Sequence, residues 1–186
     1  LGLADGRAEF EGPGTVALVA DRVETAMRWR KDLLTMISER VVVLSREEAL
    51  ADGIRGGVIP DVFVVDADLG GPGAGLRLMS ELRSRAATRH AAVLMMRHEG
   101  AAETTAMAFD LGANDLVDAD CPPRELGLRL RTLMQRKRAA DRMRASVKDG
   151  LRLAVIDPLT GLYNRRYALP QLAAISDRSA ETGISF

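Results

Sequence analysis

Residues 62–66 read Val-Phe-Val-Val-Asp, an apolar run of four that ends in a carboxylate. A continuous apolar run of this length is typical of a strand that is buried on both faces, as in a parallel sheet. The chain then passes into an amphipathic stretch at 76–85, which predicts a helix. We therefore interpret 62–85 as one strand–helix unit whose strand ends at Asp66.

The same alternation of a short apolar run and an amphipathic stretch occurs on both sides of this unit. Five strands, each followed by a helix, predict an α/β fold with a doubly wound parallel sheet, right-handed crossovers and the strand order 2-1-3-4-5. Residues 1–14 lack this periodicity and are interpreted as a linker or tail. The predicted strands are 16–19, 41–44, 62–65, 92–96 and 115–117, and the predicted helices are 22–39, 46–54, 76–85, 101–111 and one that begins after Pro122-Pro123.

The fifth helix is predicted to extend well beyond the sheet. Residues 124–156 contain no proline, and their two glycines, Gly127 and Gly150, lie near the two ends. At about 1.5 Å per residue, this stretch predicts a helix on the order of 50 Å long. Charged residues such as Lys137 and Arg144 interrupt its heptads. We therefore expect a weak or adjustable coiled coil, which suits a signalling connector.

Composition limits the classes of partner. The chain has 26 basic and 26 acidic residues, so no global field favours nucleic acid or an anionic membrane. The basic residues at 129–148 have neither a strong zipper nor an asparagine beside them, so we interpret them as a solvated helix face. Cys121 is the only cysteine, and no apolar run approaches the roughly 20 residues that span a bilayer. We expect a cytoplasmic protein that binds neither nucleic acid nor membrane.

Two carboxylates follow predicted strands that meet at the switch point of such a sheet. Asp21 follows the first strand and Asp66 ends the third. Ligands bind open α/β sheets at this point, so the pair indicates a site, although either aspartate alone is compatible with a helix cap. His90 and His98 lack the spacing of a zinc site and are interpreted as surface residues.

The span from Val16 to about Leu133 resembles the receiver domain of two-component response regulators, which has the CheY-like fold. Residues 60–66 look like the strand that ends in the phosphoacceptor aspartate, here Asp66, and residues 111–115 look like the turn into the fifth strand. The resemblance implies a receiver-like domain over 15–135. It also implies a Mg²⁺ ion held beside Asp66 by an acidic pair after the first strand.

Residues 157–166 resemble the Asp-x-Leu-Thr-x-Leu-x-Asn-Arg-Arg signature that opens GGDEF diguanylate cyclase domains. The resemblance implies that 124–156 is a connector and that 157–186 is the N-terminal fragment of a GGDEF domain, in an order similar to that of PleD-type regulators. All seven specified positions match, namely Asp157, Leu159, Thr160, Leu162, Asn164, Arg165 and Arg166.

This signature is predicted to act as a joint. We expect Asp157 to cap the following helix, Leu159 and Leu162 to pack on a cyclase core, and Arg165 and Arg166 to orient the connector through hydrogen bonds. The catalytic hairpin and the metal-binding aspartate of such domains do not occur in these 186 residues. The chain is therefore not expected to be an enzyme by itself, whereas its parent is expected to be a diguanylate cyclase.

Three positions that the receiver resemblance assigns to the site have lost their chemistry. The resemblance places an acid at Ala20, a serine or threonine at Arg97 and a lysine at Ala119, while Asp21 and Asp66 are retained. These losses should weaken Mg²⁺ and phosphoryl binding. We predict a pseudo-receiver that requires no cofactor and has at most a weak Mg²⁺ site at Asp21 and Asp66. We also expect the Arg97 guanidinium to lie against Asp66 or Asp21 in place of the metal.

Three functions follow from these patterns. The favoured one is a signal-transduction adaptor that packs on another receiver of the same parent chain and forms a homodimer with a second protomer. Dimerisation would then control a C-terminal diguanylate cyclase in cyclic di-GMP signalling through effective concentration. The alternative is a functional receiver that accepts phosphate on Asp66 in a phosphorelay, with Asp68 as a replacement metal ligand. In the third, arginines such as Arg40 bind cyclic di-GMP.

Overall fold

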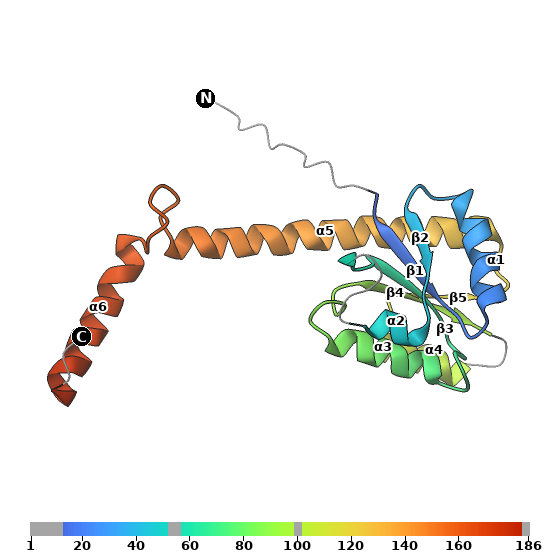
Figure 1. Cartoon of the computed structure of the whole chain (residues 1–186), viewed down its shortest axis with the longest axis horizontal. Coiled ribbons are helices and arrows are strands. Elements are labelled where there is room, and N and C mark those ends of the chain that lie inside the picture. The colour runs from blue at the N-terminus through green and yellow to red at the C-terminus, as the bar shows by residue number, and fades with distance from the viewer. Residues whose placement is uncertain (1–12, 52–56, 99–101, 184–186) are drawn as a thin grey trace, which may run out of the picture. The chain divides into compact units, whose positions relative to one another are not determined.

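The computed structural model describes residues 13–51, 57–98 and 102–183 (Figure 1). The chain forms two compact units, which comprise residues 1–137 and 138–186. The first unit contains a sheet with helices on both faces, and the second contains the last part of α5 together with α6. Nowhere in the described ranges is a helix both long enough and apolar enough to cross a membrane.

Five parallel strands form one sheet in the first unit. Their hydrogen bonds give the order β2-β1-β3-β4-β5, which confirms the predicted doubly wound α/β topology. Every residue of β1 and of β3 is buried, as expected for strands covered on both faces. The strands are β1 Thr15–Val19, β2 Arg40–Val43, β3 Val62–Asp66, β4 Ala92–Arg97 and β5 Asp115–Asp118.

Each predicted helix of the sheet domain is present. The observed helices are α1 Val23–Leu34, α2 Arg46–Leu50, α3 Ala74–Ser84, α4 Ala102–Asp110 and α5 Pro123–Val155. Helix α1 ends at Leu34, five residues before its predicted end, and the predicted end of the second helix lies outside the described residues. Helix α5 agrees with its prediction to within one residue at each end.

Two hydrophobic cores lie on opposite faces of the sheet. Because successive strand residues point to opposite faces, Val62 and Val64 pack with α1 and α5, whereas Phe63 and Val65 pack with α2, α3 and α4. The arrangement of the helices above and below the sheet is visible in Figure 1. Trp29 of α1 belongs to the core under α5 and is only 2% exposed. The sheet therefore holds its carboxyl edge between two packed layers.

Arg83 of α3 fixes the connection into β5. Its guanidinium donates hydrogen bonds to the carbonyl oxygens of Ala91 (2.6 Å) and Gly112 (2.7 Å) and to Oδ1 of Asn114 (2.9 Å). The same Asn114 oxygen accepts the N–H of Val93 at 2.8 Å. Burial lowers the pKa of Arg83 from its ordinary value, but a guanidinium stays charged in proteins. The Arg83 side chain thus links α3 to the residues just before β4 and just before β5.

Replacing Arg83 with methionine should destabilise the first unit, because it leaves several partly buried carbonyl oxygens without donors. We expect a loss of about 2 kcal/mol in the free energy of unfolding, measured by urea denaturation. Arg77→Met on the exposed face of the same helix is the matched control and should cost far less. Equal losses in the two variants would show that the Arg83 hydrogen bonds do not stabilise the fold.

Candidate functional site

Asp66 is a nearly buried carboxylate at the carboxyl edge of the sheet. It ends β3 and is 5% exposed. Its Oδ1 accepts the backbone N–H of Asp68 at 3.1 Å and lies 2.9 Å from Nε2 of His98. His98 directly follows β4, the neighbouring strand, and its side chain is 44% exposed. Burying a carboxylate without partners is costly, and Asp68 and His98 supply those partners here.

The other residues of the predicted pocket lie around the same edge of the sheet. Asp21 follows β1 and is exposed. A Cβ placed on Gly70, in the loop after β3, would lie 3.9 Å from Oδ1 of Asp21, so this carboxylate is directed toward that loop. Ala20 and Ala119 pack against the core beneath α1 and α5. Neither alanine brings a charge or a hydrogen-bond donor to the edge.

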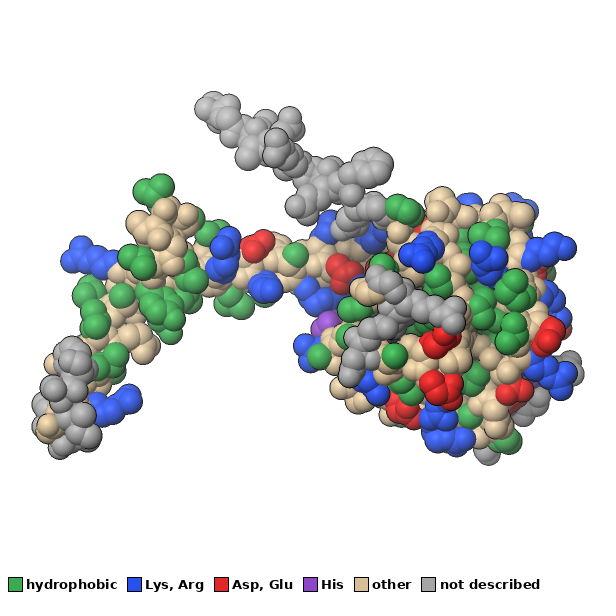
Figure 2. Space-filling model, viewed as in Figure 1, with side chains coloured by type: hydrophobic (Ala, Val, Ile, Leu, Met, Phe, Trp, Pro, Cys, Tyr) green, Lys and Arg blue, Asp and Glu red, His purple; other side chains and the backbone are tan. Residues whose placement is uncertain are grey.

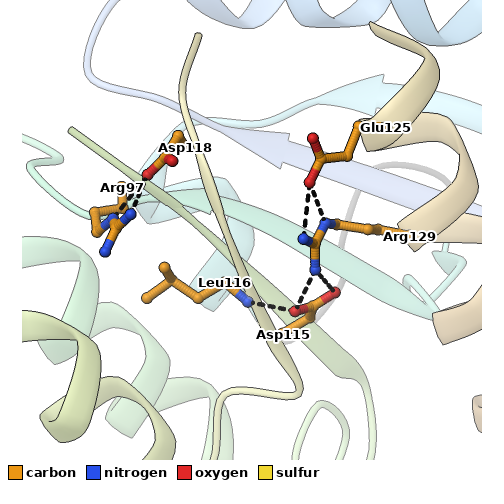
Figure 3. Close-up of polar contacts among 6 residues, drawn as sticks. All are labelled: Arg97, Asp115, Leu116, Asp118, Glu125 and Arg129. Carbon is orange, nitrogen blue, oxygen red and sulfur yellow. Dashed lines mark hydrogen bonds and ion pairs between the residues drawn. The ribbon is translucent and has the colours of Figure 1, made fainter. Parts of the chain in front are cut away.

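Arg97 does not lie against Asp66 or Asp21, so the expectation of that contact is wrong. Its guanidinium donates to Oδ1 of Asp118 through Nε at 2.8 Å and through Nη2 at 2.5 Å (Figure 3). Its Nη1 lies 3.4 Å from the hydroxyl of Thr105. Arg97 stands opposite Asp118 in the β4–β5 register, which brings the two side chains to the same face.

A second group of ion pairs joins β5 to α5. Arg129 donates to both carboxylate oxygens of Asp115 at 3.0 Å and to Oε1 of Glu125 at 2.7 Å (Figure 3). Hydrogen bonds to Glu125 and to Asp115 raise the pKa of Arg129 above its ordinary value. The edge strand β5 is therefore attached to β4 by Arg97 and to α5 by Arg129. Sequence reasoning missed both contacts.

The site offers fewer carboxylates than the receiver resemblance implies for Mg²⁺. Hard carboxylate oxygens are the protein ligands of this ion. Within the described ranges, no group of three or more His, Cys, Asp and Glu side chains is placed to hold a metal ion. In addition, the Oδ1 of Asp66 is already in contact with Asp68 and His98. The site therefore lacks the complete acidic pair that the receiver resemblance implies, because Ala20 stands at one of its two positions.

In the second unit, Asp157 closes a short turn after α5. Its Oδ1 accepts the N–H groups of Leu159 (3.0 Å) and Thr160 (2.9 Å) and the hydroxyl of Thr160 (3.1 Å). These hydrogen bonds, with the Thr160 N–H the strongest contributor, lower the pKa of Asp157. An antiparallel bridge between Ile156 and Tyr163 closes the loop behind the turn.

Asn164, not Asp157, caps the helix that follows, α6 Arg165–Thr182. Its Oδ1 accepts the N–H of Tyr167 at 2.9 Å, and its Nδ2 donates to the carbonyl oxygen of Ala154 at 2.7 Å. The prediction of an Asp157 cap is wrong because the carboxylate of Asp157 is used by its own turn. Asn164 instead links the end of α5 to the start of α6.

The remaining positions of this motif are exposed. Leu159 and Leu162 are 92% and 69% exposed, and their packing on a cyclase core stays a prediction. Arg165 and Arg166 are also exposed, and neither guanidinium forms a hydrogen bond or ion pair within the described part of the chain. The expected orienting bonds of these arginines are therefore not seen among the described residues.

The turn at Asp157 should depend on pH in one direction. Because folding depresses the pKa of Asp157, its stabilisation is present above the ordinary aspartate pKa and is lost as the pH falls through the folded value. Thr160→Val removes the hydroxyl donor, so the pKa of Asp157 should rise toward its ordinary value. Carboxyl-carbon NMR titration measures the pKa of Asp157 in the wild type and in the variant. The remote variant Thr35→Val should leave the Asp157 titration unchanged, and an unchanged titration in Thr160→Val would contradict the turn geometry.

The fold and the carboxylate at the end of β3 define the class of protein. A five-stranded parallel sheet in the order 2-1-3-4-5, with helices on both faces, is the CheY-like fold. A CheY-like receiver domain protein of Methanospirillum hungatei shares it with a TM-score of 0.59 at 14% identity, over 69% of this chain and 99% of that one. The chain contains a receiver domain of the response-regulator type.

A sequence relative and a further solved structure also indicate a response regulator. Response regulator PleD of Caulobacter vibrioides is 34% identical over 182 residues, which are 97% of this chain. A protein of Chloroflexus aurantiacus described as a response regulator is 26% identical, with a TM-score of 0.57 over 67% of this chain and 99% of its own. No family model matches the chain. The receiver domain is thus similar to PleD, and the chain spans 39% of the length of that relative.

Proposed function

We propose that the chain is a non-enzymatic signalling adaptor, in which a degenerate receiver controls the pairing of two protomers and thereby a diguanylate cyclase that follows in the parent protein. The observation that carries the proposal is the state of Asp66. Its Oδ1 is in contact with His98 and with the backbone of Asp68. Ala20 and Ala119 offer no acid and no lysine at the positions that the receiver resemblance assigns to them.

The part of α5 in the second unit supports pairing with a second protomer. Met143, Val147 and Leu151 are 68%, 55% and 66% exposed, and their four-residue spacing places them on one side of the helix. Figure 2 shows hydrophobic side chains exposed along this part of the chain. An apolar stripe on an exposed helix supports a contact surface at this place. In the proposal, the same stripe of a second protomer covers it.

The motif at 157–166 supports a cyclase after this helix. All seven specified positions of the GGDEF opening signature match, and the similarity to PleD extends along 97% of this chain. The exposed Leu159 and Leu162 offer apolar contacts to a domain that follows. Because cyclase domains of this kind join substrates held on opposing subunits, pairing of the helices would raise the effective concentration of one subunit at the other.

Sedimentation equilibrium of the chain tests the adaptor function. We expect concentration-dependent dimerisation that Val147→Glu weakens by about tenfold or more, because the variant places a charge in an apolar contact. Ser146→Glu, on an exposed neighbouring position, is the charge-matched control and should dimerise like the wild type. Mg²⁺ with beryllofluoride, a phosphoryl mimic, should leave the equilibrium unchanged.

Two outcomes would contradict the proposal. A chain that stays monomeric at every concentration would remove the dimerisation step. Dimerisation that requires beryllofluoride and disappears in Asp66→Asn would show that Asp66 is a functional phosphoacceptor, which is the alternative function.

A further inference from the structure

Strand alternation decides which side chain reaches Asp66. Val62 and Val64 of β3 face the core beneath α1 and α5, as do Leu94 and Met96 of β4. Asp66 has the same parity as these β3 residues and stands opposite Met96. Side chains alternate between the two faces of a sheet. His98, the first residue after β4, therefore lies on the same face as Met96, next to Asp66. Arg97 falls on the opposite face, where it binds Asp118.

A nearly buried carboxylate needs a compensating partner. Asp66 is 5% exposed, and the residues that the receiver resemblance places around it no longer supply a lysine or a complete acidic pair for a metal. Arg97 is paired with Asp118 at 2.5 Å. The side chain that does contact Asp66 is His98, whose Nε2 lies 2.9 Å from Oδ1.

We propose that His98 takes the place of the cation at Asp66 and is a positioning residue that keeps the carboxyl edge of the sheet in one state without metal or phosphate. The inference rests on the proposed degenerate receiver. The backbone already joins the same two segments, because the N–H of Ala67 donates to the carbonyl oxygen of Met96 at 2.9 Å. The imidazole adds a side-chain link between β3 and the segment that leads into α4. It also occupies Oδ1, one of the two carboxylate oxygens that could bind a divalent cation or accept a phosphoryl group.

A double-mutant cycle between Asp66 and His98, followed by thermal unfolding, tests this link. His98→Ala should lower the Tm by about 2–4 °C, the size expected for losing one such contact in a chain of this length. In the Asp66→Asn background the same change should lower it by less than half as much, because the charged partner is gone. His90→Ala removes the other histidine, which is exposed and far from Asp66 in the sequence, and should change the Tm by the same small amount in both backgrounds.

A second variant keeps the test informative if Asp66→Asn does not fold. His98→Gln retains a side-chain donor of similar reach, so it should recover a substantial part of the Tm that His98→Ala loses. If glutamine and alanine give the same loss, His98 acts through packing alone and the proposed link is overturned. Equal losses for His98→Ala in the two Asp66 backgrounds would overturn it as well.

Repeating the melts with Mg²⁺ and beryllofluoride separates failure of this inference from failure of the proposed function. If the Tm losses of the Asp66 and His98 variants are additive and beryllofluoride does not shift the Tm, the His98 link is overturned and the degenerate receiver stands. A clear rise in the Tm of the wild type that Asp66→Asn abolishes would overturn both, because ligands that bind only the folded state stabilise it. Coupled losses without a beryllofluoride shift are the result that the inference expects.

Discussion

The pairing of β3 with β1 on one side and β4 on the other is the constraint on which the rest of the structure depends. All five residues of β3 are buried, so the strand contributes to both cores at once. Its end also sets the position of Asp66 and of the turn into α3. A Cβ on Gly75 would lie 2.2 Å from the carbonyl oxygen of Asp66, so α3 approaches the strand end as closely as only glycine permits.

The strand register then determines how charge is balanced at the carboxyl edge. Two consecutive residues at the end of β4 contact different carboxylates. Arg97 binds Asp118 on one face of the sheet, and His98 contacts Asp66 on the other. Asp66 and Asp118 are each in contact with a side chain of the chain itself, which supports the proposed adaptor function.

Much of the fold was predictable from the sequence because it follows from burial. Apolar runs located all five strands, the strand–helix alternation predicted their order, and the absence of proline predicted α5. Helix ends were less predictable, as at Leu34, because local capping decides them. Side-chain partners were hardest. The receiver resemblance and the neighbouring third and fourth strands suggested Arg97 as the partner of Asp66 or Asp21, whereas strict alternation along β3 and β4 would have selected His98. Similarly, Asn164 rather than Asp157 caps α6 because Asp157 is used by its own turn.

We propose that Asp66 is held by the protein and does not accept phosphate. Incubation of the chain with acetyl phosphate and Mg²⁺, followed by intact-mass spectrometry under conditions that preserve acyl phosphates, tests it most directly. The account predicts that the mass of the chain stays unchanged. A gain of one phosphoryl group that is absent from Asp66→Asn would contradict it and would establish the chain as a phosphoacceptor.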